Sequence, residues 1–275
     1  MSLFLGVLTG LVLGLTGAGG SIFAVPLLMA GLGWTLTQAV PVALLAVAAS
    51  AALGTYIAWH KSYVRYKTAG LMAAAGMLTS PLGLKASTAL PQTALSILFA
   101  LVLVAVAIRM FLRASRVPEE AAVVRAAVAG DGSHAHGPIC RLNANTGRII
   151  WTRPCALMIS AIGLVTGFLS GLLGVGGGFV IVPSLRAFTE LSMHSAVATS
   201  LMAIALTSLG TVAGAVLLGR DLPWLIAVPF VIGALLGMTG GRWLAPYIAG
   251  ARLQEVFAIL MLLVAAGMAL HAIST

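Results

Sequence analysis

Two glycine-rich runs hold the residues of this chain that are best suited to bind a ligand. Consecutive glycines break a helix and let a ligand approach the exposed backbone. The half-helix that follows each run begins with free N–H groups and a partial positive charge, which favours an anion. We therefore predict binding positions in both runs. They are Gly17, Gly19, Gly20 and Ser21 in the first run, and Gly174, Gly176, Gly177 and Gly178 in the second.

Close helix packing is the main alternative for glycines in apolar sequence. Gly6, Gly10 and Gly14 follow one another at intervals of four residues, a spacing typical of small residues between packed helices. We assign these three to packing. The same role is open for the glycine runs, although packing alone does not require consecutive glycines followed by Pro26 or Pro183. A nucleotide-binding loop is disfavoured, because no Lys-Ser/Thr pair follows either run.

Four polar side chains are further candidates for contact with an anion. Lys85 and Arg242 are 157 residues apart and could flank an anion path, or could extend from helix ends toward the membrane surface. Thr199 and Ser200 could donate hydrogen bonds to an oxyanion, or could bond to the backbone of their own helix. Both alternatives stay open from the sequence alone.

The positions of the carboxylates and cysteines limit the other chemistries. All six carboxylates fall in predicted loops or at helix ends, which disfavours a cation carrier. No pairing of a nucleophile with a base is evident, so we predict neither an enzyme nor a cofactor. His134, His136 and Cys140 could ligate a metal, but they lack a fourth ligand, and we predict no metal site. Cys140 and Cys155 are too few for a disulfide framework.

The two glycine runs belong to a longer internal repeat. Residues 6–28 match residues 163–185 at one constant spacing of 157, including eight matched Gly, Thr and Pro positions. After each run, Val42-Ala43 in the first half stands where the second half has Thr199-Ser200. A glycine-broken helix repeated in the two halves of a membrane protein indicates the substrate site of a transporter.

Composition places the elements that carry these residues in a membrane. Sixty per cent of the residues are apolar and 8% are charged, against about 25% in a soluble domain. We predict an all-α integral membrane protein of about eight transmembrane segments in two homologous four-segment halves, with segments 1 and 5 broken by the glycine runs. The two halves cover residues 1–113 and 153–275. Residues 114–152 between them form a cytoplasmic linker, in which Asn145-Thr146-Gly147 suggests a short hairpin. The apolar segments cover 2–33, 38–59, 68–84, 86–108, 154–189, 195–219, 222–241 and 251–272.

The formal net charge of +9 is spread between the apolar segments, so it predicts membrane topology rather than nucleic-acid binding. Eight crossings place eleven basic residues on the side of the linker and four on the other. If segments 1 and 5 instead turn back, each half crosses three times, and the counts become thirteen and two. Both arrangements put the linker in the cytoplasm. We favour eight crossings, because each long segment could cross even with an unwound centre.

The repeated motifs also resemble a known family. GLTGAGGSIFAVPLL and GLLGVGGGFVIVPSL, with AVATSL after the second, are similar to motifs of the TauE/SafE sulfite exporter family, also called the toluene sulfonate uptake permease family. The resemblance covers about 1–110 and 153–275. It implies a multi-pass inner-membrane protein that moves sulfite, sulfonates or related anions. We therefore expect a transporter of a small sulfur-containing or organic anion, with assembly into a homo-oligomer left open. The alternative is a membrane assembly or structural protein without transport activity.

Overall fold

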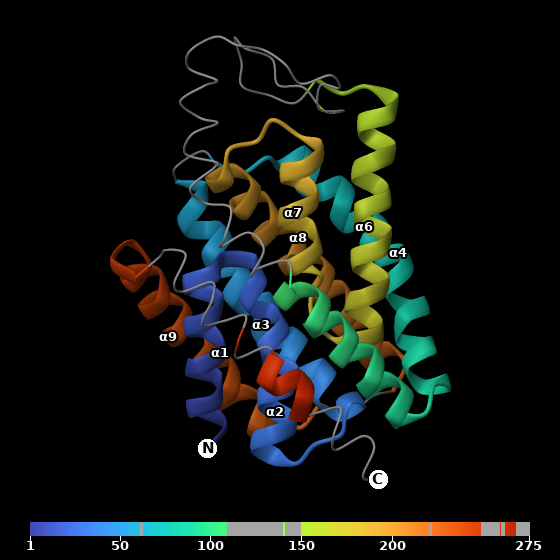
Figure 1. Cartoon of the computed structure of the whole chain (residues 1–275), viewed down its shortest axis with the longest axis vertical. Coiled ribbons are helices and arrows are strands. Elements are labelled where there is room, and N and C mark those ends of the chain that lie inside the picture. Colours follow the sequence, from blue (N-terminus) through green and yellow to red (C-terminus); the bar gives the residue numbers. More distant parts are fainter. Residues whose placement is uncertain are drawn as a thin grey trace.

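The computed structural model describes residues 1–60, 63–108, 140, 150–219, 222–248, 259 and 262–267. Within these residues the protein is helical and has no strand, only one isolated parallel bridge between Cys140 and Thr189. The predicted all-α membrane class agrees with this architecture (Figure 1). The helices long and apolar enough to cross a membrane cover Leu36–Trp59, Arg153–Leu173, His194–Leu217 and Trp224–Leu244, and shorter apolar helices cover Ser2–Thr16, Gly20–Leu32, Gln92–Ile108 and Gly178–Phe188.

The first long apolar segment folds back on itself. Helix α1 (Ser2–Thr16) is followed by the 3₁₀ helix η1 (Gly17–Phe23) and by α2 (Ala24–Leu32). A Cβ added to Gly31, near the end of α2, would lie 2.5 Å from Cδ1 of Leu5, near the start of α1. The two outer ends therefore lie side by side, as Figure 1 shows for α2 and the N-terminus. We call α1, η1 and α2 the first hairpin.

The second long segment folds back in the same way. Helix α6 (Arg153–Leu173) and helix α7 (Gly178–Phe188) are separated by residues 174–177. A disulfide joins Cys155, at the start of α6, to Cys140, and the Cys140 N–H donates to the Phe188 carbonyl at the end of α7 (3.0 Å). The start of α6 and the end of α7 therefore lie together. We call α6, residues 174–177 and α7 the second hairpin.

These hairpins correct the topology that the sequence favours. A full crossing by segments 1 and 5 is wrong for this structure, and the turned-back alternative describes both segments. The reason is visible at Gly174, Gly176 and Gly177, whose φ angles of 72°, 70° and 70° are left-handed. Residues in this conformation reverse the chain instead of continuing the helix.

Helices α3 (Leu36–Trp59) and α8 (Met193–Leu217) cross antiparallel at the centre of the molecule. The last part of α3 meets the first part of α8: a Cβ added to Gly54 would lie 3.1 Å from Cδ1 of Leu201, and Ala58 packs with Ala198. The starts of α3 and α8 are separated by the repeat spacing of 157 residues. Because α2 precedes α3 and α7 precedes α8, the two hairpins begin at opposite ends of the molecule.

Glycines hold each hairpin against a helix of the other half of the chain. Helix α1 packs along α9 (Trp224–Ile248), and α6 packs along α4 (Tyr66–Ala89). The packing role predicted for the glycines of α1 is confirmed, because a Cβ at any of them would overlap the backbone of α9. On α9, the Cβ positions of Gly6, Gly10 and Gly14 meet the carbonyl groups of Phe230, Ala234 and Met238, in that order. On α4, the Cβ positions of Gly163, Gly167 and Gly171 meet the carbonyl groups of Met72, Gly76 and Ser80.

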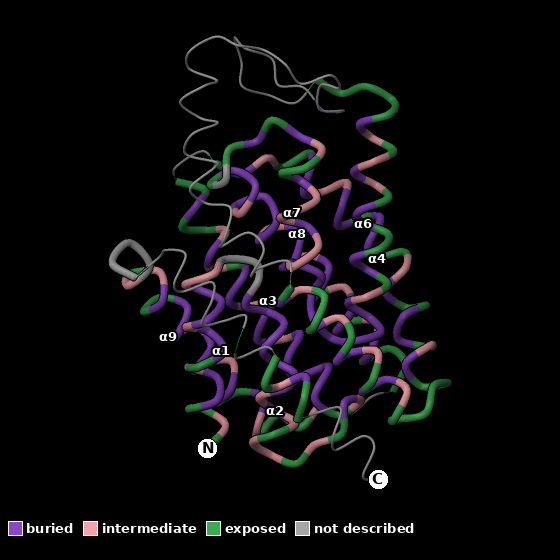
Figure 2. The backbone as a smooth tube through the Cα atoms, viewed as in Figure 1, coloured by how far each residue is buried: buried purple, intermediate pink, exposed green. Residues whose placement is uncertain are grey.

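Polar residues mark where several helices begin. The Thr35 N–H donates to Oε1 of Gln38 before α3 (3.3 Å), and the Thr152 hydroxyl accepts from the Cys155 N–H before α6 (3.4 Å). The Ser192 hydroxyl accepts from the Ser195 N–H at the start of α8 (3.3 Å). With these caps, α3, α6 and α8 begin one or two residues before the predicted apolar segments. Figure 2 shows that the buried residues gather in the interior where α1, α3, α7 and α8 meet.

Several predictions fall outside the described residues. They are the proposed hairpin at Asn145-Thr146-Gly147, the residues His134 and His136, and most of the segment 251–272. Cys140 is described, and its disulfide with Cys155 leaves no thiolate to ligate a metal. The sequence analysis missed this bond, because two cysteines give no spacing pattern to recognise.

Candidate functional site

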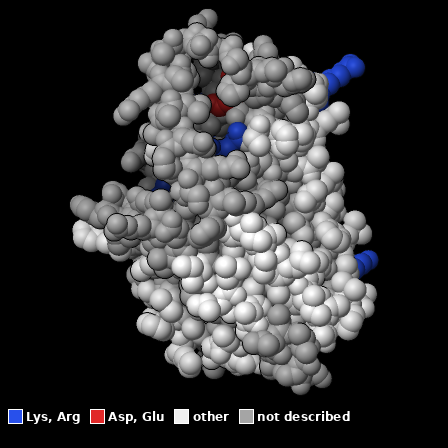
Figure 3. All heavy atoms as spheres, viewed as in Figure 1, with Lys and Arg blue, Asp and Glu red and all other residues white. Residues whose placement is uncertain are grey.

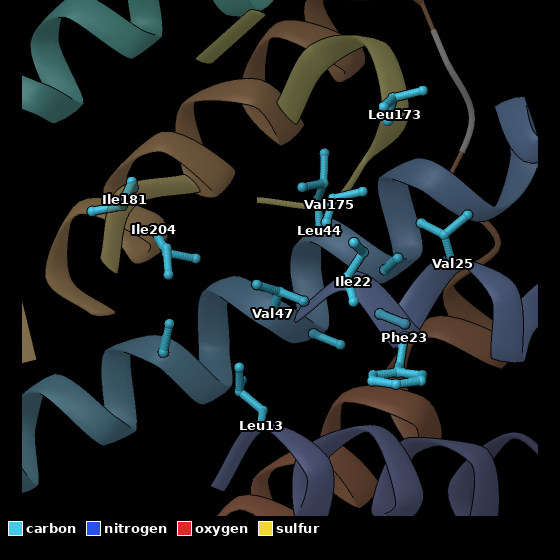
Figure 4. Packing of buried hydrophobic residues seen from close by; sticks show 14 of the residues in the cluster. Leu13, Ile22, Phe23, Val25, Leu44, Val47, Leu173, Val175, Ile181 and Ile204 are labelled. Atoms are coloured by element: carbon cyan, nitrogen blue, oxygen red, sulfur yellow. The ribbon is translucent and has the colours of Figure 1, made fainter. Parts of the chain in front are cut away.

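The tips of the two hairpins meet where α3 and α8 cross. The first tip, η1, contacts both α7 and α8. In Figure 4, Ile22 of the first tip and Val175 of the second lie beside Leu44 and Val47 of α3, close to Ile204 of α8. All five side chains are buried. The structure thus brings the two predicted glycine runs together at the middle of the protein, and we call this place the tip site.

Hydrogen-bond donors are left over in the backbone of the second tip. The N–H groups of Val180 and Ile181 both donate to the Gly177 carbonyl, at 3.1 and 3.2 Å. Those of Gly178 and Phe179 donate no hydrogen bond to any other residue that the structure describes. Gly178 is buried and Phe179 is partly buried. Buried N–H groups are nearly always paired, so this end of α7 is suited to accept a ligand.

Only glycine fits the second tip, for two separate reasons. Gly174 caps α6 and Gly177 caps α7, both with left-handed φ angles. Space is also short: a Cβ at Gly174 would lie 2.6 Å from Cγ2 of Val40. A Cβ at Gly176 would lie 3.1 Å from the Ser208 hydroxyl and 3.2 Å from Val47. The glycines let α3 and α8 close around the tip.

The first tip is built differently. Gly17, Gly19 and Gly20 lie in the 3₁₀ helix η1 rather than in a turn between two helices. A Cβ at Gly20 would lie 2.5 Å from the backbone nitrogen of Leu13, so this tip packs directly onto α1. Ser21 is fully buried and makes an interaction of its own. The two glycine runs are therefore equivalent in sequence but not in conformation.

Thr199 and Ser200 lie at the start of α8, and both hydroxyls have partners within the protein. The Thr199 hydroxyl accepts a hydrogen bond from the Arg65 N–H (3.1 Å), which fastens the α3–α4 connection to α8. The Ser200 hydroxyl donates to the Val197 carbonyl of its own helix (2.8 Å). The contacts of α8 with the second tip come from Ile204 and Ser208, one and two turns further along the helix.

Lys85 and Arg242 occupy different surroundings despite their equal positions in the repeat. Lys85 is exposed on the last turns of α4. Arg242 is partly buried, and its Nη1 donates to the Gly54 carbonyl of α3 at 2.6 Å. The structure thus connects Arg242 to the central helix pair and leaves Lys85 at the surface. Among the described residues on the face in Figure 3, a few basic side chains lie apart from one another among uncharged ones.

Three buried serines that the sequence analysis missed carry hydroxyl groups without a hydrogen-bond partner. They are Ser50 of α3, Ser170 of α6 and Ser208 of α8, each with 1% or less of its surface exposed. Single serines in apolar helices form no motif, so only the packed structure distinguishes them. Of the three, Ser208 is the one whose hydroxyl lies against the second tip.

The groups that the structure describes at the tip site are hydrogen-bond donors. Among the described residues, no three His, Cys, Asp or Glu side chains gather into a possible metal site. Glu190, between α7 and α8, is the one carboxylate that the structure describes. The fold and the site together define a multi-pass helical membrane protein with hydrogen-bond donors buried between two hairpins.

Comparison with known families identifies the group to which this protein belongs. The model of the sulfite exporter TauE/SafE family matches residues 2–268. The chain is therefore a member of the TauE/SafE family, in agreement with the resemblance found in its repeated motifs.

Relatives occur in bacteria and archaea. A probable membrane transporter protein of Xylella fastidiosa is 29% identical over 264 residues, which cover 94% of this chain and 90% of that protein. The probable membrane transporter protein YunE of Bacillus subtilis is 28% identical over 244 residues, 85% of this chain and 83% of that protein. A probable membrane transporter protein of Methanocaldococcus jannaschii is 54% identical over 48 residues, 18% of each chain. No solved structure matches the chain.

Proposed function

We propose that this protein is a membrane transporter that carries a small sulfur-containing or organic anion through the tip site. The observation that carries the proposal is the buried start of α7, whose free N–H groups face the place where both glycine runs meet. A helix start binds anions through these groups and through its dipole. The TauE/SafE family and the names of the relatives support transport as the activity.

Alternating access would use the two hairpins as the moving parts. We propose that residues 1–113 and 153–275 are inverted repeats, because α3 and α8 run antiparallel and start 157 residues apart. The hairpins begin at opposite ends of the molecule and meet in the middle. Each packs on a helix of the other half, α1 on α9 and α6 on α4. A movement of one half against the other would open the tip site to one side at a time.

The proposed orientation follows the basic residues. With both hairpins turned back, thirteen basic residues lie on the side of the linker and two on the other. This difference favours a cytoplasmic linker, residues 114–152, in a multi-pass protein of the inner membrane. The partners would be the lipid bilayer and the anion, and assembly into a homo-oligomer stays a proposal.

Uptake into proteoliposomes tests the function. Purified protein is reconstituted, and the entry of radiolabelled sulfite is measured against protein-free vesicles, with methanesulfonate, acetate and rubidium in parallel. We expect protein-dependent entry of at least one of the anions and none of the cation. Protein that reconstitutes as folded, monodisperse material and yet moves none of the anions would favour the alternative of an assembly or structural protein.

A further inference from the structure

We propose that the Ser208 hydroxyl and the free N–H groups of Gly178 and Phe179 form a subsite for one small oxyanion at the second tip. The inference rests on the proposed function and names the residues and the ligand class of the same site. Its ligand is an anion whose oxygen atoms accept hydrogen bonds, such as sulfite, a small sulfonate or a small carboxylate.

The first observation is the state of the Ser208 side chain. The residue is fully buried in α8, and its hydroxyl has no hydrogen-bond partner in the described structure. The usual bond from a serine to a carbonyl of its own helix is absent here, although Ser200 of the same helix makes it at 2.8 Å. A buried hydroxyl without a partner is unfavourable for folding. Such a group is expected where a ligand supplies the missing bond.

The second observation is the position of that hydroxyl. Its oxygen would lie 3.1 Å from a Cβ added to Gly176. The hydroxyl therefore lies against Gly176, two residues before Gly178, whose N–H is free. The hydroxyl and the N–H groups come from different helices, α8 and α7, and both lie beside the tip site. Neutral donors of this kind can hold an oxyanion without a charged partner.

Close packing limits the size of the ligand. Val47, Ile204 and Ser208 all lie 3.1–3.2 Å from the Cβ position of Gly176. The second hairpin must shift to admit an anion, and a small one requires the smallest shift. We therefore expect sulfite or methanesulfonate to bind and an aromatic sulfonate to be excluded.

The repeat indicates that the subsite is single. The residue 157 positions before Ser208 is Ala51, which carries no hydroxyl. The first tip also lies in a 3₁₀ helix packed on α1 instead of presenting the start of a following helix at a turn. The second half of the chain thus has a hydroxyl and a helix start that the first half lacks at the equivalent places, and one anion would bind per protein chain.

The test compares Ser208→Ala with Ser200→Ala, a matched change that removes a partnered hydroxyl from the same helix. Reconstituted wild-type and variant proteins are assayed for sulfite uptake over a range of concentrations, and their Tm is measured without an anion. For Ser208→Ala we expect a Tm equal to or above that of the wild type, since an unpaired buried hydroxyl is lost. We also expect the sulfite KM to rise about tenfold or more, because the variant loses a hydrogen bond to a charged group. Ser200→Ala should leave the KM unchanged.

The outcomes separate this inference from the proposed function. If the wild type carries sulfite or methanesulfonate and Ser208→Ala does so with the same KM, the subsite is wrong while transport stands. A lower Tm in Ser208→Ala with an unchanged KM would assign the serine to packing. If the wild type carries no anion at all, the proposed function fails first. Strong competition by benzenesulfonate at concentrations where methanesulfonate competes would contradict the size limit.

Discussion

The side chains at the centre of this protein differ in whether the fold already satisfies their hydrogen bonds. Thr199 and Ser200 have protein partners, whereas Ser208 and the N–H groups of Gly178 and Phe179 have none among the described residues. Sequence reasoning selected the first pair, because adjacent hydroxyls form a visible pattern. It could not select Ser208, because the position of this hydroxyl against the second tip depends on Gly176, 32 residues earlier in the chain.

Thr199→Val tests the structural role of Thr199. The substitution keeps the shape of the side chain and removes the acceptor of the Arg65 N–H. We expect a loss of about 1–3 kcal/mol in the free energy of unfolding, because a part-buried N–H is left unpaired. The KM for transport should change little. A variant with normal thermal stability and a strongly raised KM would instead place Thr199 in contact with the substrate.

The glycines of the second tip are poor sites for bulky test substitutions. Gly176 has a φ of 70°, so a side chain there is strained even before it meets Val47 and Ser208. Gly176→Val would lose transport through misfolding as readily as through the loss of a ligand. Variants of Ser208 avoid this ambiguity, because they leave the backbone of the tip unchanged.

At the scale of the elements, the sequence predicts where the helices lie but not how the long segments run. The predicted segments 38–59 and 195–219 correspond closely to α3 (Leu36–Trp59) and α8 (Met193–Leu217). The predicted and observed bounds agree because the apolar composition of these two segments marks where each helix runs. Composition cannot distinguish a broken helix that continues from one that turns back. That choice depends on the left-handed φ angles of Gly174, Gly176 and Gly177, which glycine permits and does not require.

The glycine contacts between α4 and α6 should be essential for the fold. A Cβ at Gly167 would overlap the backbone of Gly76, so Gly167→Leu must push the helices apart. We expect this variant to lose several kcal/mol of stability or to fail to yield folded protein, as large overpacking does. Gly70→Ala is the control: Gly70 lies in α4 with no neighbouring atom within 4 Å of its Cβ position. Alanine there should stabilise the helix by about 0.5–1 kcal/mol. Equal thermal stability of the two variants in detergent would contradict the packing account.

At the scale of the whole molecule, the hairpins determine which chain ends share a side of the membrane. The first hairpin places Ser2 and Thr35 on the same side, whereas a full crossing by residues 2–33 would separate them. Single cysteines at these positions can be labelled in intact cells with a reagent that does not cross membranes. The native cysteines should not interfere, because both are fully buried. We expect Ser2→Cys and Thr35→Cys to react alike, and labelling of only one of them would contradict the hairpin.

Equilibrium exchange in proteoliposomes tests the central claim, transport through a site that opens to one side at a time. Vesicles containing the wild-type protein are loaded with unlabelled sulfite at the external concentration, and a trace of radiolabelled sulfite is added outside. With no gradient to drive net flow, alternating access predicts that label still enters, faster than in protein-free vesicles, and that the rate saturates as the sulfite concentration rises. Label entry no faster than in protein-free vesicles, or entry that rises without saturation, would contradict this account of the two hairpins.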